Sequence, residues 1–352
     1  MKKRNVILNI FSVIILLLFI WYADKNFDSY KIRVLNLCAI YVILGLSMNL
    51  INGFTGLFSL GHAGFMAVGA YTTALLTMSP AAKAQTFFLE PIISPLDKIT
   101  LPFFIALIMG GILSGLVAFL IGAPTLRLKG DYLAIATLGF SEIIRIIFTN
   151  TQTITNGPLG LKSIPNSTNL WWSYGMMLFT LAFIIALIKS SYGKAFKAIR
   201  EDEIAAESMG INLFKHKSMA FVIGAFFAGI GGGLLGNLLG AINPNMFRSI
   251  LTFNVLLIIV LGGMGSITGT VLSAFVVTAG LEYLRFLDET INLGFIKIPG
   301  VAGLRMVVFS ALLMIVVIFF RNGLMGNNEF DWDKFFNFFQ RKSLRKKEAQ
   351  ES

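Results

Sequence analysis

Apolar runs separated by short polar segments dominate the pattern of the chain. In "VILNIFSVIILLLFIWY", near the start, apolar side chains follow one another instead of alternating with polar ones. A helix needs about 20 apolar residues to cross a bilayer, whereas a membrane β-strand uses about ten alternating residues. The pattern therefore predicts an all-α polytopic membrane protein with about ten transmembrane helices. We expect the spans near residues 6–22, 34–51, 62–78, 101–123, 131–149, 170–188, 218–240, 251–262, 267–284 and 301–320.

Composition supports this interpretation. The chain has 352 residues, of which 56% are hydrophobic and 13% are charged, whereas a soluble protein carries about 25% charged residues. The range 251–262 is short for a crossing and could be part of a broken helix inside the bundle. The apolar start resembles a signal peptide, but its long apolar core and the lack of a cleavage pattern favour an uncleaved first helix. The single cysteine, Cys38, excludes an internal disulfide.

Lysine and arginine positions predict the orientation of the chain. If the N-terminus is cytoplasmic, the cytoplasmic segments hold roughly twice as many of these residues as the outside segments. The formal charge of +11 then follows from the positive-inside rule and does not indicate nucleic acid binding. We expect a transmembrane domain over 1–326 that contains a cytoplasmic loop at 189–217. A basic tail at 327–352 follows, with both termini in the cytoplasm.

Small residues recur within the predicted spans. Many of the 34 glycines stand four residues apart, a spacing that lets helix backbones approach closely in lipid. Tight packing explains most of these glycines, and some could line a conduit. The stretch "GLFSLGHAGFMAVGAYTTALL" (56–76) combines such small residues with Ser59 and His62.

The predicted cytoplasmic loop contains "SYGKAFKAIREDEIAAESMGINLFKHK". Composition favours a helix over 200–209, with Gly210 as its C-terminal stop. Ile204, Ala205 and Met209 could form an apolar strip. A helix this short is marginal alone, so docking on a partner would stabilise it. A solvated connector between two spans is the alternative.

Several stretches together resemble the branched-chain amino-acid permeases of ABC importers, most closely their M-type subunits. "AAESMG" is similar to the coupling loop E-A-A-x-x-x-G, which Ala205, Ala206 and Gly210 match, although Ile204 replaces the glutamate and no I-x-L-P follows. The stretch 56–76 belongs to the same resemblance. Further stretches follow in the order of that family: "LRLKGDYLAIATLGFSEIIR", "GKAFKAIREDEIAAESMGIN", "VLGGMGSITGTVLSAFVVTAGLEYLR" and "GLRMVVFSALLMIVVIFFRNGLMG".

The resemblance implies a permease subunit within a larger importer of the bacterial cell membrane. Its partners would be a related second permease subunit, two ATPase subunits and an extracytoplasmic substrate-binding protein that delivers a small molecule. ATP and magnesium would bind the ATPases, because this chain has no G-x-x-x-x-G-K-[ST] motif, catalytic constellation, metal site or cofactor site. The resemblance assigns ATPase coupling to Arg200, Glu201, Asp202, Glu203, Ala205, Ala206 and Gly210.

Polar residues in the spans are candidates for a substrate pathway or gate, namely Ser59, His62, Thr137, Ser141, Glu142 and Arg145. Glu142 and Arg145 share one helical face and form either a structural ion pair or part of a pathway. For His62, a hydrogen-bonded position at the start of a helix is the simpler interpretation. We expect Asn237 and Asn254 to form hydrogen bonds between helices.

The outside loop near 150–169 is rich in turn-forming residues. Asn156, Gly157 and Gly160 of this loop could contact a binding protein. We expect no deep substrate site, because an importer must release its cargo. Urea or short-chain amides are an alternative cargo. A secondary transporter or channel without ATPases is an alternative mechanism, and a membrane enzyme is disfavoured.

Overall fold

The computed structural model describes residues 3–128, 130–288, 291–292, 297–298, 303–304, 307–311, 314, 323–326 and 329. This part of the chain is nearly all helical, which confirms the predicted class. Two short strands, β1 (Ile291–Asn292) and β2 (Lys297–Ile298), pair in an antiparallel manner. The predicted span 301–320 and the tail 327–352 lie largely outside the described residues and stay predictions.

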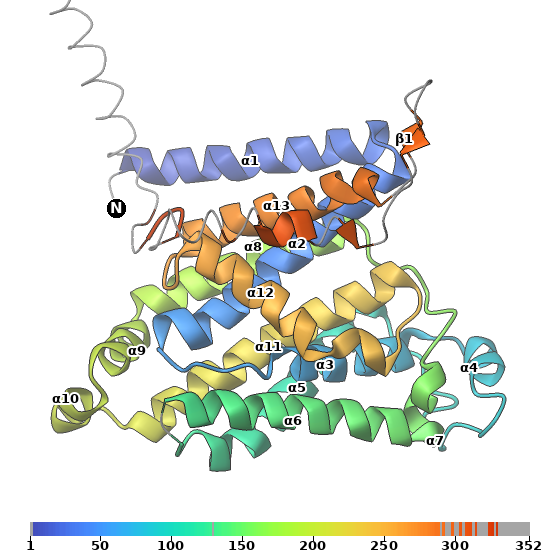
Figure 1. The fold of residues 1–352 in the computed structure, drawn as a ribbon, viewed down its shortest axis with the longest axis horizontal. Helices are drawn as coiled ribbons and strands as arrows, with labels where there is room; N and C mark the ends of the chain where they lie inside the picture. Colours follow the sequence, from blue (N-terminus) through green and yellow to red (C-terminus); the bar gives the residue numbers. More distant parts are fainter. Residues whose placement is uncertain are drawn as a thin grey trace, which may run out of the picture.

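The longer helices run roughly side by side (Figure 1). They are α1 (Lys3–Asn26), α2 (Ser29–Asn49), α3 (His62–Thr77), α5 (Phe103–Thr125), α6 (Asp131–Asn150), α8 (Leu170–Lys189), α11 (Leu213–Leu239), α12 (Ser249–Gly262) and α13 (Ile267–Tyr283). Short helices cap the two ends: α9 (Ser191–Glu201) and α10 (Glu203–Ser208) at one, α4 (Pro80–Thr86) and α7 (Gln152–Thr155) at the other. We call these the α9–α10 end and the α4–α7 end. The 3-10 turns are η2 (Gly157–Leu159), η3 (Pro244–Phe247) and η4 (Leu284–Leu287).

Five helical segments in the described part are long and apolar enough to cross a membrane: Ser29–Phe54, Phe103–Thr125, Asp131–Asn150, Leu170–Lys189 and Leu213–Leu239. The first of them joins α2 to a π-helical turn, η1 (Leu50–Phe54). By contrast, α3, α12 and α13 have only 16, 14 and 17 residues. The structure thus supports a multi-pass membrane protein, while the number of crossings stays a prediction.

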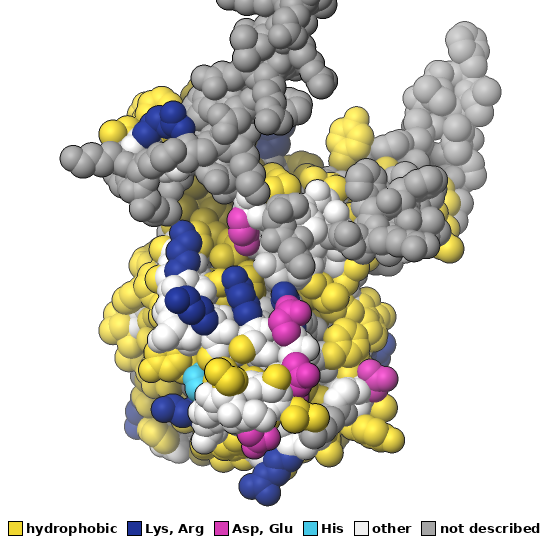
Figure 2. Space-filling view, turned by 90° about the vertical axis from the view of Figure 1, so that its left-hand side faces the viewer, with side chains coloured by type: hydrophobic (Ala, Val, Ile, Leu, Met, Phe, Trp, Pro, Cys, Tyr) yellow, Lys and Arg dark blue, Asp and Glu magenta, His cyan; other side chains and the backbone are white. Residues whose placement is uncertain are grey.

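Charged side chains gather at the α9–α10 end. Figure 2 looks onto this end and shows lysine, arginine and acidic side chains there, with hydrophobic side chains around them. Large apolar side chains stay exposed along the helices, among them Leu120 on α5 and Ile135 on α6. Such faces suit contact with lipid rather than with water.

Glycines hold α3, α5 and α11 together at the level of their backbones. A methyl group added at Gly69 on α3 would overlap the Gly229 carbonyl of α11. A methyl group at Gly229 would overlap the Ser114 hydroxyl of α5, and one at Gly232 would overlap the Met66 carbonyl of α3. These helices pack through small residues because lipid supplies no hydrophobic force to press larger side chains together.

Gly69→Ala should therefore destabilise the protein. We expect its free energy of unfolding to fall by about 1–3 kcal/mol, because the added methyl group has no space between α3 and α11. The matched control is Gly139→Ala on α6, where an added methyl group meets no atom within 4 Å. This control should be neutral or stabilising by up to about 1 kcal/mol, since alanine favours helix. Thermal unfolding of the purified chain in detergent measures both, and equal behaviour of the two variants would contradict the packing argument.

Candidate functional site

The segment predicted to couple to an ATPase is two helices, not one. The expected single helix over 200–209 is wrong, because the chain is extended at Asp202, between α9 and α10. The Asp202 carboxylate accepts hydrogen bonds from the backbone N–H groups of Ile204 (2.8 Å) and Ala205 (3.0 Å). An aspartate capping the first turn starts a new helix. Arg200 and Glu201 therefore belong to α9, and Asp202 stands between the two helices. The other predicted coupling residues belong to α10 and the turn after it.

The short helix α10 turns two apolar side chains to the outside. Ile204 is 73% exposed and Met209 is 84% exposed, whereas Ala206 is buried against its own chain. Lys217 at the start of α11 donates to the Glu203 carboxylate at 2.6 Å and ties α10 to the bundle. Gly210 ends this segment with a φ of +83°, a conformation that favours glycine. The segment thus exposes two apolar side chains on a short helix that a salt bridge holds against α11.

Arg200 reaches from α9 into the helix bundle. Its Nη1 donates to the carbonyl of Gly53, in η1, at 3.1 Å. A methyl group added at Gly265, in the turn between α12 and α13, would lie 2.6 Å from the same nitrogen. Arg200 also pairs with Glu201 at 2.7 Å. One side chain of the predicted coupling segment therefore contacts the end of α2 and the α12–α13 turn.

Buried amides on α2 extend this contact inward. The Asn49 amide donates to the Ser266 carbonyl (2.9 Å) and to the Thr270 hydroxyl (2.8 Å), and its oxygen accepts from the Gly265 N–H (2.8 Å). Asn52 exchanges hydrogen bonds with the backbone of Ser59. Sequence reasoning did not single out Asn49 or Asn52. The sequence feature that could have pointed to them is the pair of asparagines three residues apart in "SMNLINGF", at the end of an apolar run.

Four predicted pathway residues hold the start of α3. The His62 Nε2 lies 2.8 Å from the Ser47 hydroxyl, which agrees with the simpler interpretation of His62. Thr137 of α6 accepts a hydrogen bond from the Leu60 N–H at 2.9 Å. Ser59 is buried in the same segment, and Ser141 is buried where α6 packs against Gly64. A direct role of these residues in a pathway stays a prediction.

Glu142 and Arg145 form the ion pair that their spacing predicted. Arg145 Nε donates to the Glu142 carboxylate at 2.8 Å, and its Nη1 donates to Asn245, in η3, at 3.2 Å. The pair thus joins α6 to the connection between α11 and α12. The interhelical hydrogen bond predicted for Asn237 is confirmed, since its Oδ1 accepts from Thr77 of α3 at 3.2 Å. The one predicted for Asn254 is wrong: among the described residues its side chain has no such partner.

The predicted binding-protein contact residues near α7 form contacts within the protein that stabilise the loop. Asn156 is buried, and its amide donates to the carbonyls of Thr86 (3.1 Å) and Gly160 (2.8 Å). Gly157 and Gly160 adopt positive φ values of 55° and 67°, and a methyl group at Gly160 would overlap the Ile242 carbonyl. These residues shape the α4–α7 end from within. Their contact with a binding protein stays a prediction.

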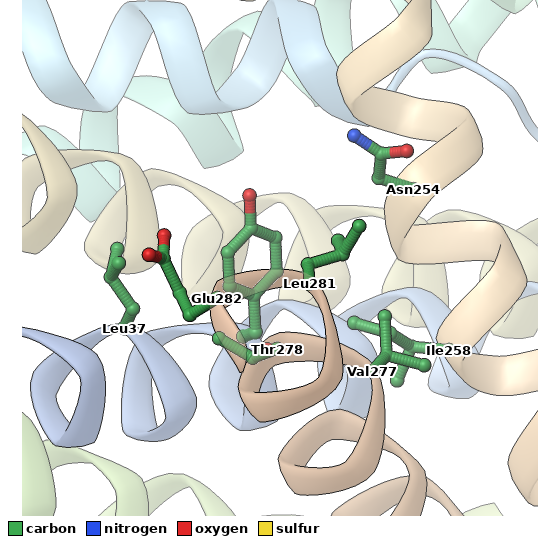
Figure 3. A pocket seen from close by; sticks show the side chains of 8 residues that line it. Leu37, Asn254, Ile258, Val277, Thr278, Leu281 and Glu282 are labelled. Atoms are coloured by element: carbon green, nitrogen blue, oxygen red, sulfur yellow. The ribbon is translucent and has the colours of Figure 1, made fainter. Parts of the chain in front are cut away.

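A cavity of about 150 Å³ lies between α2, α12 and α13 (Figure 3). Its lining residues are Leu37, Tyr41, Asn254, Ile258, Val277, Thr278, Leu281 and Glu282. A second cavity, of about 200 Å³, shares Leu37 and Tyr41 and is otherwise apolar. A wider groove of about 710 Å³ at the α4–α7 end also includes Glu282. Sequence reasoning did not single out Glu282, although an acidic residue at the end of the apolar run "VLSAFVVTAGLEY" was the available signal.

Comparison with known proteins shows the family. A family model described as "Branched-chain amino acid transport system / permease component" matches residues 30–318. The chain belongs to this permease family. It is 34% identical over 293 residues to the high-affinity branched-chain amino acid transport system permease protein LivM of Salmonella typhimurium, with 74% of this chain and 64% of that protein covered. The chain thus spans just under two thirds of LivM.

Other relatives show the breadth of this permease family. The chain is 22% identical over 332 residues to the permease protein LivH of Salmonella typhimurium, with 88% of this chain and 97% of that protein covered. It is 27% identical over 164 residues to the autoinducer 2 import system permease protein LsrC of Yersinia enterocolitica, with 44% and 45% covered. No solved structure matches the chain significantly. Membership of this permease family agrees with a multi-pass membrane protein.

A buried lysine holds the α4–α7 end of this permease in shape. Lys83 of α4 is 1% exposed, and its Nζ donates to the carbonyls of Leu96 and Ile99, both at 2.6 Å. Burial lowers the pKa of the Lys83 ammonium below its usual range, and the nearby Asp97 carboxylate opposes this shift. The lysine thus fastens the connection between α4 and α5 onto α4.

Lys83→Met should loosen the connection over 87–102. Two carbonyls then lose their donor, and we expect local opening to become easier by about 1–3 kcal/mol. Since the native pKa is lowered, the contribution of Lys83 to stability should rise as pH increases toward the ordinary lysine value of about 10.4. Limited proteolysis within 87–102, at pH 8 and at pH 10, measures both effects. The exposed Lys98→Met is the control, and equal cleavage of the two variants would show that Lys83 does not hold the loop.

Proposed function

We propose that this chain is a membrane-spanning permease subunit of an ATP-driven, binding-protein-dependent importer of branched-chain amino acids. The observation that carries the proposal is the 34% identity to LivM over 293 residues, together with the family match over 30–318. The chain moves leucine, isoleucine and valine by alternating access between the two sides of the membrane. Separate ATPase subunits supply the energy through ATP and magnesium.

The α9–α10 end is the side that meets the ATPases. Its gathered charges agree with a cytoplasmic position under the positive-inside rule. The exposed apolar side chains of Ile204 and Met209 suit insertion into a groove of a partner. The opposite end, with α4 and α7, then meets an extracytoplasmic substrate-binding protein.

A second, related permease subunit completes the membrane pathway. The similarity to LivH supports this part of the proposal, because LivM and LivH are two different permease proteins that are both named for the high-affinity branched-chain amino acid transport system. The helices that face this partner would bury apolar side chains that are exposed in the single chain.

The test is uptake by vesicles that contain the assembled complex. Labelled leucine should accumulate only with ATP and the binding protein present, and unlabelled isoleucine and valine should compete. Urea and acetamide, at the same concentrations, should not compete. Competition by urea alone would assign a different cargo. Full uptake after removal of the ATPases would contradict the mechanism and favour a secondary transporter.

Arg200 provides a sharper test of the coupling route. Arg200→Ala removes the hydrogen bond to Gly53, so ATP hydrolysis should continue while leucine uptake falls by about tenfold or more. The control is Arg127→Ala, because Arg127 is an exposed arginine in the connection between α5 and α6. The ratio of leucine imported to ATP hydrolysed measures the effect. An unchanged ratio in Arg200→Ala would contradict transmission through this contact.

A further inference from the structure

The cavity between α2, α12 and α13 is lined by polar groups that form no hydrogen bonds with the described residues. Thr278 is 5% exposed, and its hydroxyl has no hydrogen-bond partner among the described residues. In the described part of the chain, the Asn254 amide and the Tyr41 hydroxyl also lack a hydrogen bond, and all three residues line the same cavity. Buried polar groups in proteins nearly always have partners, so the buried Thr278 hydroxyl, next to the half-buried Tyr41 and Asn254 side chains, points to a ligand in this cavity.

Glu282 adds a negative charge to this set. It stands on α13, whereas Asn254 stands on α12, across the cavity in Figure 3. The carboxylate accepts a hydrogen bond from the Tyr30 hydroxyl at 3.1 Å, and Arg285 lies 4.0 Å from the same oxygen. Among the described residues, no hydrogen bond or ion pair reaches the other oxygen. A carboxylate accepts about four hydrogen bonds, so Glu282 retains capacity for a further donor.

Glu282 also lies where two spaces meet. It lines the enclosed cavity and the wider groove. The other residues of the groove come from the α1–α2 connection, the start of α2, the end of α13 and η4. A molecule entering from the α4–α7 end through this groove reaches the carboxylate before the apolar interior. An ionisable side chain at the mouth of a cavity in a membrane protein is a functional candidate in its own right.

The second cavity provides an apolar space next to this polar one. Leu37 and Tyr41 form the shared wall. The remaining lining residues are Leu235, Leu239, Ile242, Met246, Phe247 and Leu251. An aliphatic side chain would bury apolar surface there without leaving a polar group unpaired.

We propose that these adjoining cavities are a transit site for an α-amino acid with an aliphatic side chain. Glu282 accepts hydrogen bonds from the α-ammonium group, and the Asn254 amide donates to the α-carboxylate. The aliphatic side chain lies toward Leu37 and Tyr41. The proposal rests on the proposed function and deepens it, because it selects a zwitterion over urea, which offers neither an ammonium group nor an aliphatic chain.

The site is built for passage rather than retention. Tyr30 and Arg285 already compensate part of the Glu282 charge before any substrate binds. The added hydrogen bond from the substrate ammonium therefore contributes less than it would at an isolated carboxylate. Release into the next part of the pathway therefore requires little energy, as an importer needs.

Cysteine protection in the assembled complex tests the occupant. Leu281→Cys, in a Cys38→Ala background, places a single reactive thiol at the cavity wall. Leucine should slow its reaction with a small maleimide. Two leucine analogues are compared, 4-methylpentanoate, which lacks the ammonium group, and 3-methylbutylamine, which lacks the carboxylate. Each should need about tenfold higher concentration for the same protection, since each loses one charge-assisted contact.

Glu282→Gln tests the assigned residue. The glutamine keeps the shape but removes the charge, so the leucine concentration for half-protection should rise about tenfold, with a smaller rise for Glu282→Asp. Protection by 4-methylpentanoate should not weaken. The control is Glu90→Gln, an exposed acid of the α4–α7 end, which should behave as the parent. Stimulation of ATP hydrolysis by the binding protein verifies that every variant folds and assembles.

The outcomes separate this proposal from the proposed function. If leucine gives no protection, or protects equally well in Glu282→Gln, while the unmodified complex imports leucine, the transit site is refuted and the importer stands. Equal protection by urea and leucine would also refute the site. If the unmodified complex imports no branched-chain amino acid, the proposed function itself falls.

Discussion

The break between α2 and α3 is the constraint on which the rest of the structure depends. Backbone groups at membrane depth must find partners within the protein, so an irregular segment survives only where neighbours satisfy it. The residues from Thr55 to Gly61 form such a segment. Asn52, Thr137 and Thr252 bind its backbone or the first turn of α3, and Arg200 binds the turn before it. These hydrogen bonds hold residues that are distant in sequence close together around the break between α2 and α3.

This arrangement ties α9 to the bundle. A displacement of Arg200 removes the partner of the Gly53 carbonyl, and the same guanidinium contacts the α12–α13 turn. Asn49 links α2 to the α12–α13 turn and to the first turn of α13 through three hydrogen bonds. Helix α9, α2 and α13 are therefore linked by side-chain hydrogen bonds and contacts. Of these helices, α2 and α13 line the cavity that includes Glu282.

Much of the fold was predictable from the sequence. Apolar runs indicate which segments can form helices in lipid, and glycine spacing indicates where those helices can pack closely. Helices occupy the predicted ranges between 34–51 and 267–284. The pairing of Glu142 with Arg145 followed from local spacing. The break at Asp202 was missed because capping and helix continuation compete within a single turn. The roles of Asn49 and Glu282 were missed because they depend on partners brought together by tertiary packing, which no local pattern records.

Glycines bring helix backbones into direct contact in two parts of the bundle. A methyl group at Gly69 or Gly232 would overlap a backbone carbonyl between α3 and α11, and one at Gly269 would overlap the Gly262 carbonyl between α13 and α12. Small cavities nevertheless remain between α2, α12 and α13, and they give these helices space in which side chains can rearrange. Arg200 lies at the end of the same helices, next to Gly53 and Gly265. In the proposed importer, a displacement of α9 would therefore act first on the helices that line the proposed transit site.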